Sequence, residues 1–294
     1  MLAIGARVLF RHPLVRSAAY DAASPQDRRE THQALAQATD PGVDPDRRAW
    51  HLAQATPGPD EQVAAELERS AVRAQARGGL AAAAAFLERS VALTVDPARR
   101  AERTLAAAQL NMRAGAFDAA LGLLNTAEAG TLDEFQSARL DLLRAHVAFA
   151  SGLGSNAPAL LLKAASRLEP LNLELARETY LDAWGAAIFA GHLAGADDLL
   201  EISRAARALP PSDPPGPMEL LLNGLALLIT DGRAAAAPTL RRAISIFASA
   251  DISVGDGLRW GWMAQAATKR PVGRRRLARD YRTVGPDRPQ GRRA

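Results

Sequence analysis

A short glycine turn that recurs at nearly constant spacing is the feature of this sequence that most constrains its fold. In each copy a helix-favouring segment runs into a glycine, and an Ala/Leu-rich segment with helical spacing of its apolar residues begins directly afterwards. A period of this length is typical of stacked helix pairs, each of which buries its apolar face only against its neighbours. The turn glycines, 36, 37, 39 and 41 residues apart, are Gly79, Gly115, Gly152, Gly191 and Gly232.

The unit around Gly115 illustrates the physics of the repeat. Glycine adopts a positive φ without a Cβ clash, so it can end one helix and let the next begin at once. We predict an all-α fold, a right-handed superhelical array of antiparallel helix pairs (a tetratricopeptide-like solenoid), with at most a short strand near residues 7–10. The apolar residues of the helix after Gly115 share one face through spacings of three and four: Phe117, Ala120, Leu121, Leu124 and Ala127.

Proline-rich breaks and a change in charge divide the chain into three expected segments. Residues 1–57 form an N-terminal helical segment, residues 58–268 form the repeats, and residues 269–294 form a basic tail. The tail has ten basic and two acidic residues, a net charge of +8, whereas the remainder of the chain carries −4. We expect such a tail to be disordered, because its charge is high and its apolar content low.

The sequence lacks the residue patterns that common catalytic and cofactor sites require. It has no cysteine, only two lysines, no glycine-rich phosphate loop and no G-x-S-x-G motif. No apolar run approaches the roughly 20 residues that span a bilayer. We therefore expect a cytoplasmic protein that is not an enzyme, has no cofactor or metal, and does not enter a membrane. The histidines never pair at helical spacing, which argues against a zinc site: His12, His32, His51, His146 and His192.

Several stretches resemble a known family, the large ATP-binding LuxR-type transcriptional regulators. They are FRHPLVRSAAY (10–20), ASPQDRR (23–29), RRAWHL (47–52), ARGGLAAAAAFLERSVALTVDPARRAER (76–103) and GLRWGW (257–262). The resemblance covers residues 8–268. It implies the end of an ATPase module followed by the tetratricopeptide-like middle of such a regulator. The phosphate loop and the C-terminal helix-turn-helix of the family are not matched, so we expect a truncated member.

Two functions are open at this point. The first is a helical-repeat scaffold or effector-sensing segment of a LuxR-type, ATP-dependent regulator, and the alternative is a free-standing adaptor that binds other proteins. In either case the array would bind a protein or a small effector. We expect weak contact with nucleic acid only through tail arginines, represented by Arg274, Arg275 and Arg276. No helix follows the last one, near residues 254–268, to cover its apolar side. Part of that side can fold back on the preceding pair, beside Ile244 and Phe247. The part left exposed is the expected site of self-association, through Leu258, Trp260, Trp262 and Met263.

Overall fold

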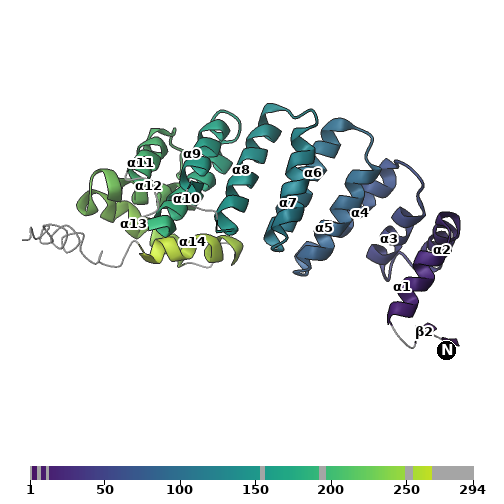
Figure 1. The fold of residues 1–294 in the computed structure, drawn as a ribbon. Helices are drawn as coiled ribbons and strands as arrows, with labels where there is room; N and C mark the ends of the chain where they lie inside the picture. The colour runs from purple at the N-terminus through teal and green to yellow at the C-terminus, as the bar shows by residue number, and fades with distance from the viewer. Residues whose placement is uncertain are drawn as a thin grey trace, which may run out of the picture. The chain divides into compact units, whose positions relative to one another are not determined.

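The computed structural model describes residues 2–4, 8–10, 13–152, 156–191, 197–248 and 254–266, and almost all of them are helical. The contacts divide the chain into two units, Met1–Ala194 and Gly195–Ala294. In order, the elements are β1 (Leu2–Ile4), β2 (Val8–Phe10), α1 (Pro13–Ala22), α2 (Pro25–Ala38), α3 (Pro45–Ala55), α4 (Glu61–Ala76), α5 (Leu80–Leu93), α6 (Pro97–Arg113), α7 (Phe117–Glu128), α8 (Glu134–Ala150), α9 (Ala157–Leu168), α10 (Leu173–Ala190), α11 (Asp198–Ala208), α12 (Pro217–Thr230), α13 (Arg233–Phe247) and α14 (Val254–Ala266) (Figure 1).

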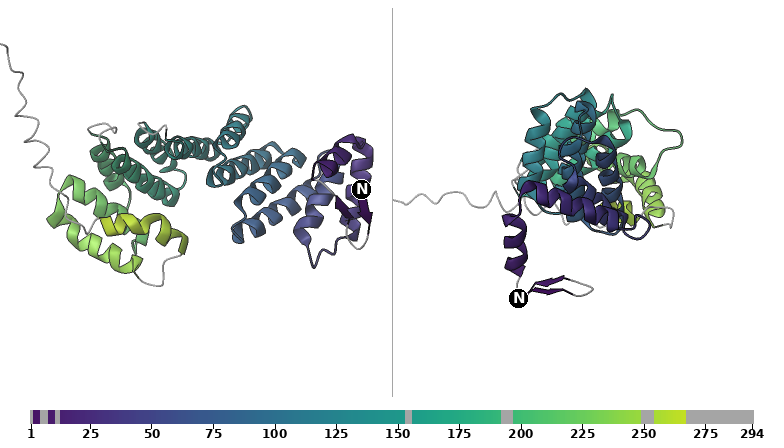
Figure 2. Two further views of the ribbon diagram at one scale, coloured as in Figure 1. Left: turned by 60° about the horizontal axis from the view of Figure 1, so that its bottom comes forward. Right: turned by 90° about the vertical axis from the view of Figure 1, so that its right-hand side faces the viewer.

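The first unit is a succession of helices in which each packs on the next, from α2 to α10. Helix α6 also contacts α8, so the first helices of consecutive pairs lie side by side. The expected pairs α4/α5, α6/α7 and α8/α9 are present, and Figure 2 shows the succession from two further directions. The all-helical prediction is confirmed apart from a small hairpin, in which β1 and β2 pair antiparallel with Leu2 opposite Phe10. The expected division at residue 57 is not a break in packing, because α3 packs on α4.

The two helices of a pair begin in different ways. The first helix begins with a side-chain cap: Asp60 accepts from the backbone N–H of Val63 at α4, and Asp96 accepts from that of Arg99 at α6. Asp133 forms a full capping box at the start of α8. Such caps satisfy backbone donors that the helix itself leaves unpaired. Helices α5 and α7 follow the glycine turn without a side-chain cap, so the turn itself must fix their start.

The glycine turns have the hydrogen-bond pattern that ends helices with a left-handed residue. At the α6–α7 turn, the N–H of Gly115 donates to the carbonyl of Met112 and the N–H of Ala116 donates to that of Asn111. The prediction that a glycine with positive φ stands in every turn is confirmed for four of the five positions. The glycines with positive φ are Gly78, Gly115, Gly152, Gly191 and Gly232, with angles of 79°, 81°, 75°, 55° and 87°.

Gly79 was the wrong glycine for the first turn. The N–H of Gly78 donates to the carbonyl of Gln75, and the N–H of Gly79 donates to that of Ala74. Gly79 therefore corresponds to Ala116 of the next turn, with an ordinary negative φ of −81°. Only the first residue of this two-residue turn needs the left-handed conformation, and here that residue is Gly78.

The core of the first unit is built from small and medium-sized side chains. Leu124 on α7 is fully buried, as predicted. Leu121 was placed on the wrong face, because it is 37% exposed, while the neighbouring Leu123 packs against the core on both sides of α7. One cluster of buried residues joins α6, α7 and α8: Leu105, Ala108, Leu124, Ala127, Leu140 and Leu143.

In the second unit α11 packs on α12, α12 on α13, and α13 on α14. A Cβ added to Gly224 on α12 would lie 2.6 Å from Cδ2 of Leu240 on α13, so these two helices approach closely because a glycine stands at their contact. No helix in the described parts of either unit is both long and apolar enough to cross a bilayer.

Two alanine substitutions around α7 should change stability in opposite directions. Gly115 and Gly122 both have nothing within 4 Å of an added Cβ, so neither substitution creates a steric clash. Gly115→Ala should destabilise the chain by about 1–2 kcal/mol, because alanine is strained at a φ of 81°. Gly122→Ala lies inside α7 and should stabilise it by about 0.5–1 kcal/mol. Urea denaturation measures both, and shifts of the same sign would contradict the assignment.

Candidate functional site

The candidate site is an exposed face formed by α8 and α10 of the first unit. On α8, Phe135, Arg139 and His146 are spaced by four and seven residues and share one side of the helix, with Phe149 one turn beyond. All four side chains are at least partly exposed. The guanidinium of Arg139 lies 5.9 Å from the ring centroid of Phe135, a cation–π contact.

Helix α10 contributes a side with the same spacing. Glu178, Asp182 and Phe189 are separated by four and seven residues, and each is at least partly exposed. Two contacts join this side to α8: Nε2 of His146 lies 2.9 Å from Oδ2 of Asp182, and the rings of Phe149 and Phe189 have centroids 6.2 Å apart. We call this surface the α8–α10 face; it comprises Phe135, Arg139, His146, Phe149, Glu178, Asp182 and Phe189.

The α8–α10 face combines apolar area with acceptors of hydrogen bonds. Phe189 is 66% exposed, and the adjacent Ile188 and Phe149 are 43% and 39% exposed. Glu178 and Asp182 place carboxylates on the same side of α10 as Phe189. This arrangement suits the binding of a segment that has an apolar side chain beside hydrogen-bond donors or a positive charge.

Two of the turn glycines stand at the ends of the helices that form the α8–α10 face. Gly152 follows the end of α8, three residues after Phe149. Gly191 ends α10, two residues after Phe189. The turns therefore set where the helices that carry the two phenylalanines end. Sequence reasoning did not find this face, although an aromatic residue just before two successive turn glycines was a visible signal.

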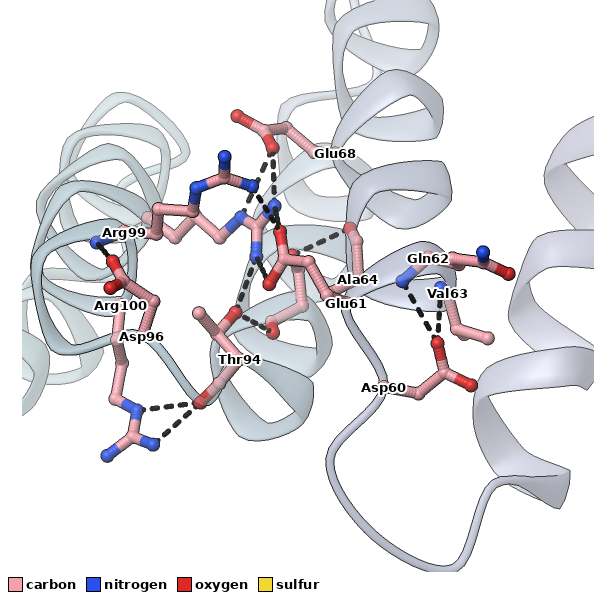
Figure 3. A network of polar contacts seen from close by, with 12 residues as sticks. Asp60, Glu61, Gln62, Val63, Ala64, Glu68, Thr94, Asp96, Arg99 and Arg100 are labelled. Atoms are coloured by element: carbon pink, nitrogen blue, oxygen red, sulfur yellow. Dashed lines mark hydrogen bonds and ion pairs between the residues drawn. The ribbon is translucent and has the colours of Figure 1, made fainter.

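Elsewhere in the first unit, a buried arginine links α4 to α6. Arg103 on α6 is only 5% exposed, and its guanidinium donates to the carboxylates of Glu61 and Glu68 on α4 at 2.8–3.1 Å. It also donates to the hydroxyl of Thr94, in the loop before α6, at 2.6 Å. Figure 3 shows Glu61, Glu68 and Thr94 close together in this network of polar contacts. The arrangement fixes the position of one helix pair relative to the next.

The charges in these contacts are stabilised by their partners. Hydrogen bonds from Arg103, and then from Arg99, lower the pKa of Glu61 despite partial burial. Between α3 and α4, burial raises the pKa of Asp46, but hydrogen bonds from Arg77, Arg73 and Ser70 outweigh it, and the net shift is downward. Both carboxylates are therefore ionised near neutral pH and remain paired.

The residues expected to mediate self-association are arranged differently from the prediction. Trp260 and Met263 on α14 are only 1% and 2% exposed, so their expected exposure was wrong. Helix α14 packs on α13, so the expected fold-back on the preceding pair is present. Trp262 is half-buried, while the side chain of Leu258 and the arginines Arg274, Arg275 and Arg276 lie outside the described residues. Self-association therefore cannot use Trp260 or Met263 in the folded chain.

Metal chemistry has no support in the part of the chain that the structure describes. There, no group of three or more His, Asp or Glu side chains is placed to hold an ion. Two open hollows lie along α11 and share Arg204. Arg207 and Asp231 in one of them already form an ion pair. Neither hollow brings together an acid, a base and a nucleophile.

No protein-family model matches the sequence, and no curated protein matches it.

Two arginines that bind the same carboxylate should differ in their contribution to stability. Arg103→Ala should lower the free energy of unfolding by about 2–4 kcal/mol, because it removes the charged hydrogen bonds and the packing of a buried guanidinium, although the two carboxylates that it binds are partly exposed. Arg99 also pairs with Glu61, at 3.0 Å, but its side chain is 64% exposed. Arg99→Ala should therefore cost less than about 1 kcal/mol. Equal losses in urea denaturation would show that the buried network does not hold α4 and α6 together.

Proposed function

We propose that the chain is a helical-repeat scaffold without enzymatic activity, which binds a protein segment or an effector within a LuxR-type, ATP-dependent transcriptional regulator. The proposal rests on two kinds of support. The sequence resembles the post-ATPase and middle segments of that family, and the helices pack in successive pairs. We further propose that the pairs form a right-handed, tetratricopeptide-like superhelix, since their short glycine turns and their period are typical of such arrays.

The observation that carries the binding function is the exposure of Phe189 beside Phe149 and the His146–Asp182 pair. Large aromatic side chains are seldom left exposed together on a folded surface without a binding role. An apolar side chain of a partner would cover the two rings. A donor or a basic group of the same partner would lie close to Asp182, whose carboxylate contacts His146. A free-standing adaptor would use the same face in the same way, so it remains the alternative within this proposal.

The α8–α10 face favours an extended or helical peptide over a small effector. Its members span about four turns of α8 and about three turns of α10. The ends of this surface are therefore too far apart for one small molecule to contact both. We propose that the ligand is a peptide segment with an aromatic or aliphatic residue close to a basic one.

An array of immobilised random peptides tests this function. The wild-type chain should bind a subset enriched in apolar and basic residues, and Phe189→Glu should weaken that binding at least tenfold. Val72→Glu is the matched control, because Val72 lies on α4 of the same unit and is also 66% exposed. Circular dichroism verifies that both variants remain helical. Binding that Val72→Glu weakens as much as Phe189→Glu would place the site elsewhere, and an array with no bound peptide would contradict peptide binding.

A further inference from the structure

Two histidines on successive helices make direct contact near the N-terminal end of the first unit. Nδ1 of His32 on α2 lies 2.9 Å from Nδ1 of His51 on α3, and the ring centroids are 5.1 Å apart. The hydroxyl of Tyr20 on α1 lies 3.2 Å from Nε2 of His32. Nε2 of His51 is buried and has no hydrogen-bond partner among the described residues. The pair lies far along the sequence from the α8–α10 face and plays no part in the function proposed for it.

The contact between the two rings holds only if one hydrogen lies between the two Nδ1 atoms. In the neutral pair, one ring donates this hydrogen and the other accepts it. One added proton can be accommodated on an outer nitrogen, with the central bond kept. A second added proton places a hydrogen on both Nδ1 atoms. Two N–H groups cannot face each other at this distance, and two positive rings repel.

The surroundings of the pair also disfavour added positive charge. Tyr20, whose hydroxyl contacts His32, also has the positive guanidinium of Arg28 at 5.3 Å from its ring centroid. Burial lowers the pKa of both histidines, and the charges of His32 and Arg47 lower that of His51 further, with Asp44 opposing them. On the other side of α3, the charged groups are engaged by α4: Asp46 with Arg73 and Arg77, and Arg48 with Glu66.

Apart from the His32–His51 contact, few buried side chains hold α2 to the rest of the unit. Among its fourteen residues only Ala36 is fully buried. Its packing partner is α3, whereas α1 contacts β2 and reaches α2 through the Tyr20–His32 hydrogen bond. In Figure 2, right, α1 stands away from the packed helices of this unit. A terminal helix with so few buried groups opens at a small free-energy cost.

We propose that the His32–His51 contact is a proton-operated joint, in which protonation of the two rings releases α2 from α3. Above pH 6.5, the ordinary histidine value, the rings are neutral and the joint is closed. Below pH 6.5, the two rings bind more protons when α2 is released than while they are in contact. The population of the open state therefore increases as the pH falls below 6.5. A transient acid step would thus expose the contacting faces of α2 and α3 while the rest of the array stays folded.

Hydrogen exchange of the full-length chain between pH 7.5 and 5 tests the joint. After correction for intrinsic exchange rates, the opening constant of α2 amides should rise by up to about 100-fold per pH unit if two protons are taken up, and by about tenfold if one is. Amides of α6 should show no such increase.

His32→Asn retains a group that can hydrogen-bond to His51 but does not titrate. It should therefore reduce the pH dependence of the α2 opening constant to at most that of one proton.

The double variant His32→Asn/His51→Asn should remove the extra pH dependence of α2, and His146→Asn on α8 should leave it unchanged. An α2 opening constant that depends on pH as strongly in the double variant as in the wild type would overturn the proposal. If the double variant does not fold, NMR titration of the wild-type imidazole signals decides. Two coupled midpoints below 6.5 support the joint, and two independent midpoints near 6.5 contradict it.

Discussion

The structure depends on one constraint: each helix can bury its apolar face only on its immediate neighbours. Leu124 is fully buried although α7 is only twelve residues long, because α6 and α8 lie on either side of it. Alanine makes this possible at many positions, since a small side chain lets helix axes come close. Where Gly224 meets Leu240 in the second unit, even the Cβ of an alanine would lie 2.6 Å from the leucine side chain.

Polar contacts between helices that belong to neighbouring pairs fix the register of one helix against another, which small apolar side chains cannot do. Arg103 links α6 to α4, Asp46 links α3 to α4, and His146 links α8 to Asp182 of α10. Each joins elements that lie in different helix pairs or at a pair boundary. The last of them belongs to the α8–α10 face, so a contact that positions the helices also shapes the surface that we propose for binding. The His32–His51 contact has the same place between helices, but its strength depends on protons.

The sequence was sufficient to predict the helix pairs α4/α5, α6/α7, α8/α9 and α12/α13, the glycine turns and the burial of Leu124, because all three follow from local spacing. It could not decide between Gly78 and Gly79, since both are glycine and only the backbone hydrogen bonds distinguish them. Leu121 and Leu123 both fit a helical apolar stripe, and the rotation of α7 against its neighbours determines which is buried. Spacing likewise did not determine how much of the apolar side of α14 is covered: the helix packs on α13, and both Trp260 and Met263 are buried.

The α8–α10 face was beyond sequence reasoning for a related reason. His146 meets Asp182 and Phe149 meets Phe189 across 36 and 40 residues of chain. Their pairing depends on how one helix pair stacks on the next, which no local pattern specifies.

The central claim, that the array is held together by contacts between neighbouring helices, is tested most directly by site-resolved hydrogen exchange of Leu124→Ala. The substitution should cost about 2–5 kcal/mol. The loss of protection should be greatest in α6, α7 and α8, decline along the first unit, and be absent from α12 and α13. Leu121→Ala, on the exposed side of α7, should change little. A uniform loss of protection over the whole chain would contradict the account, because it would show one cooperative core in place of a stack of neighbours.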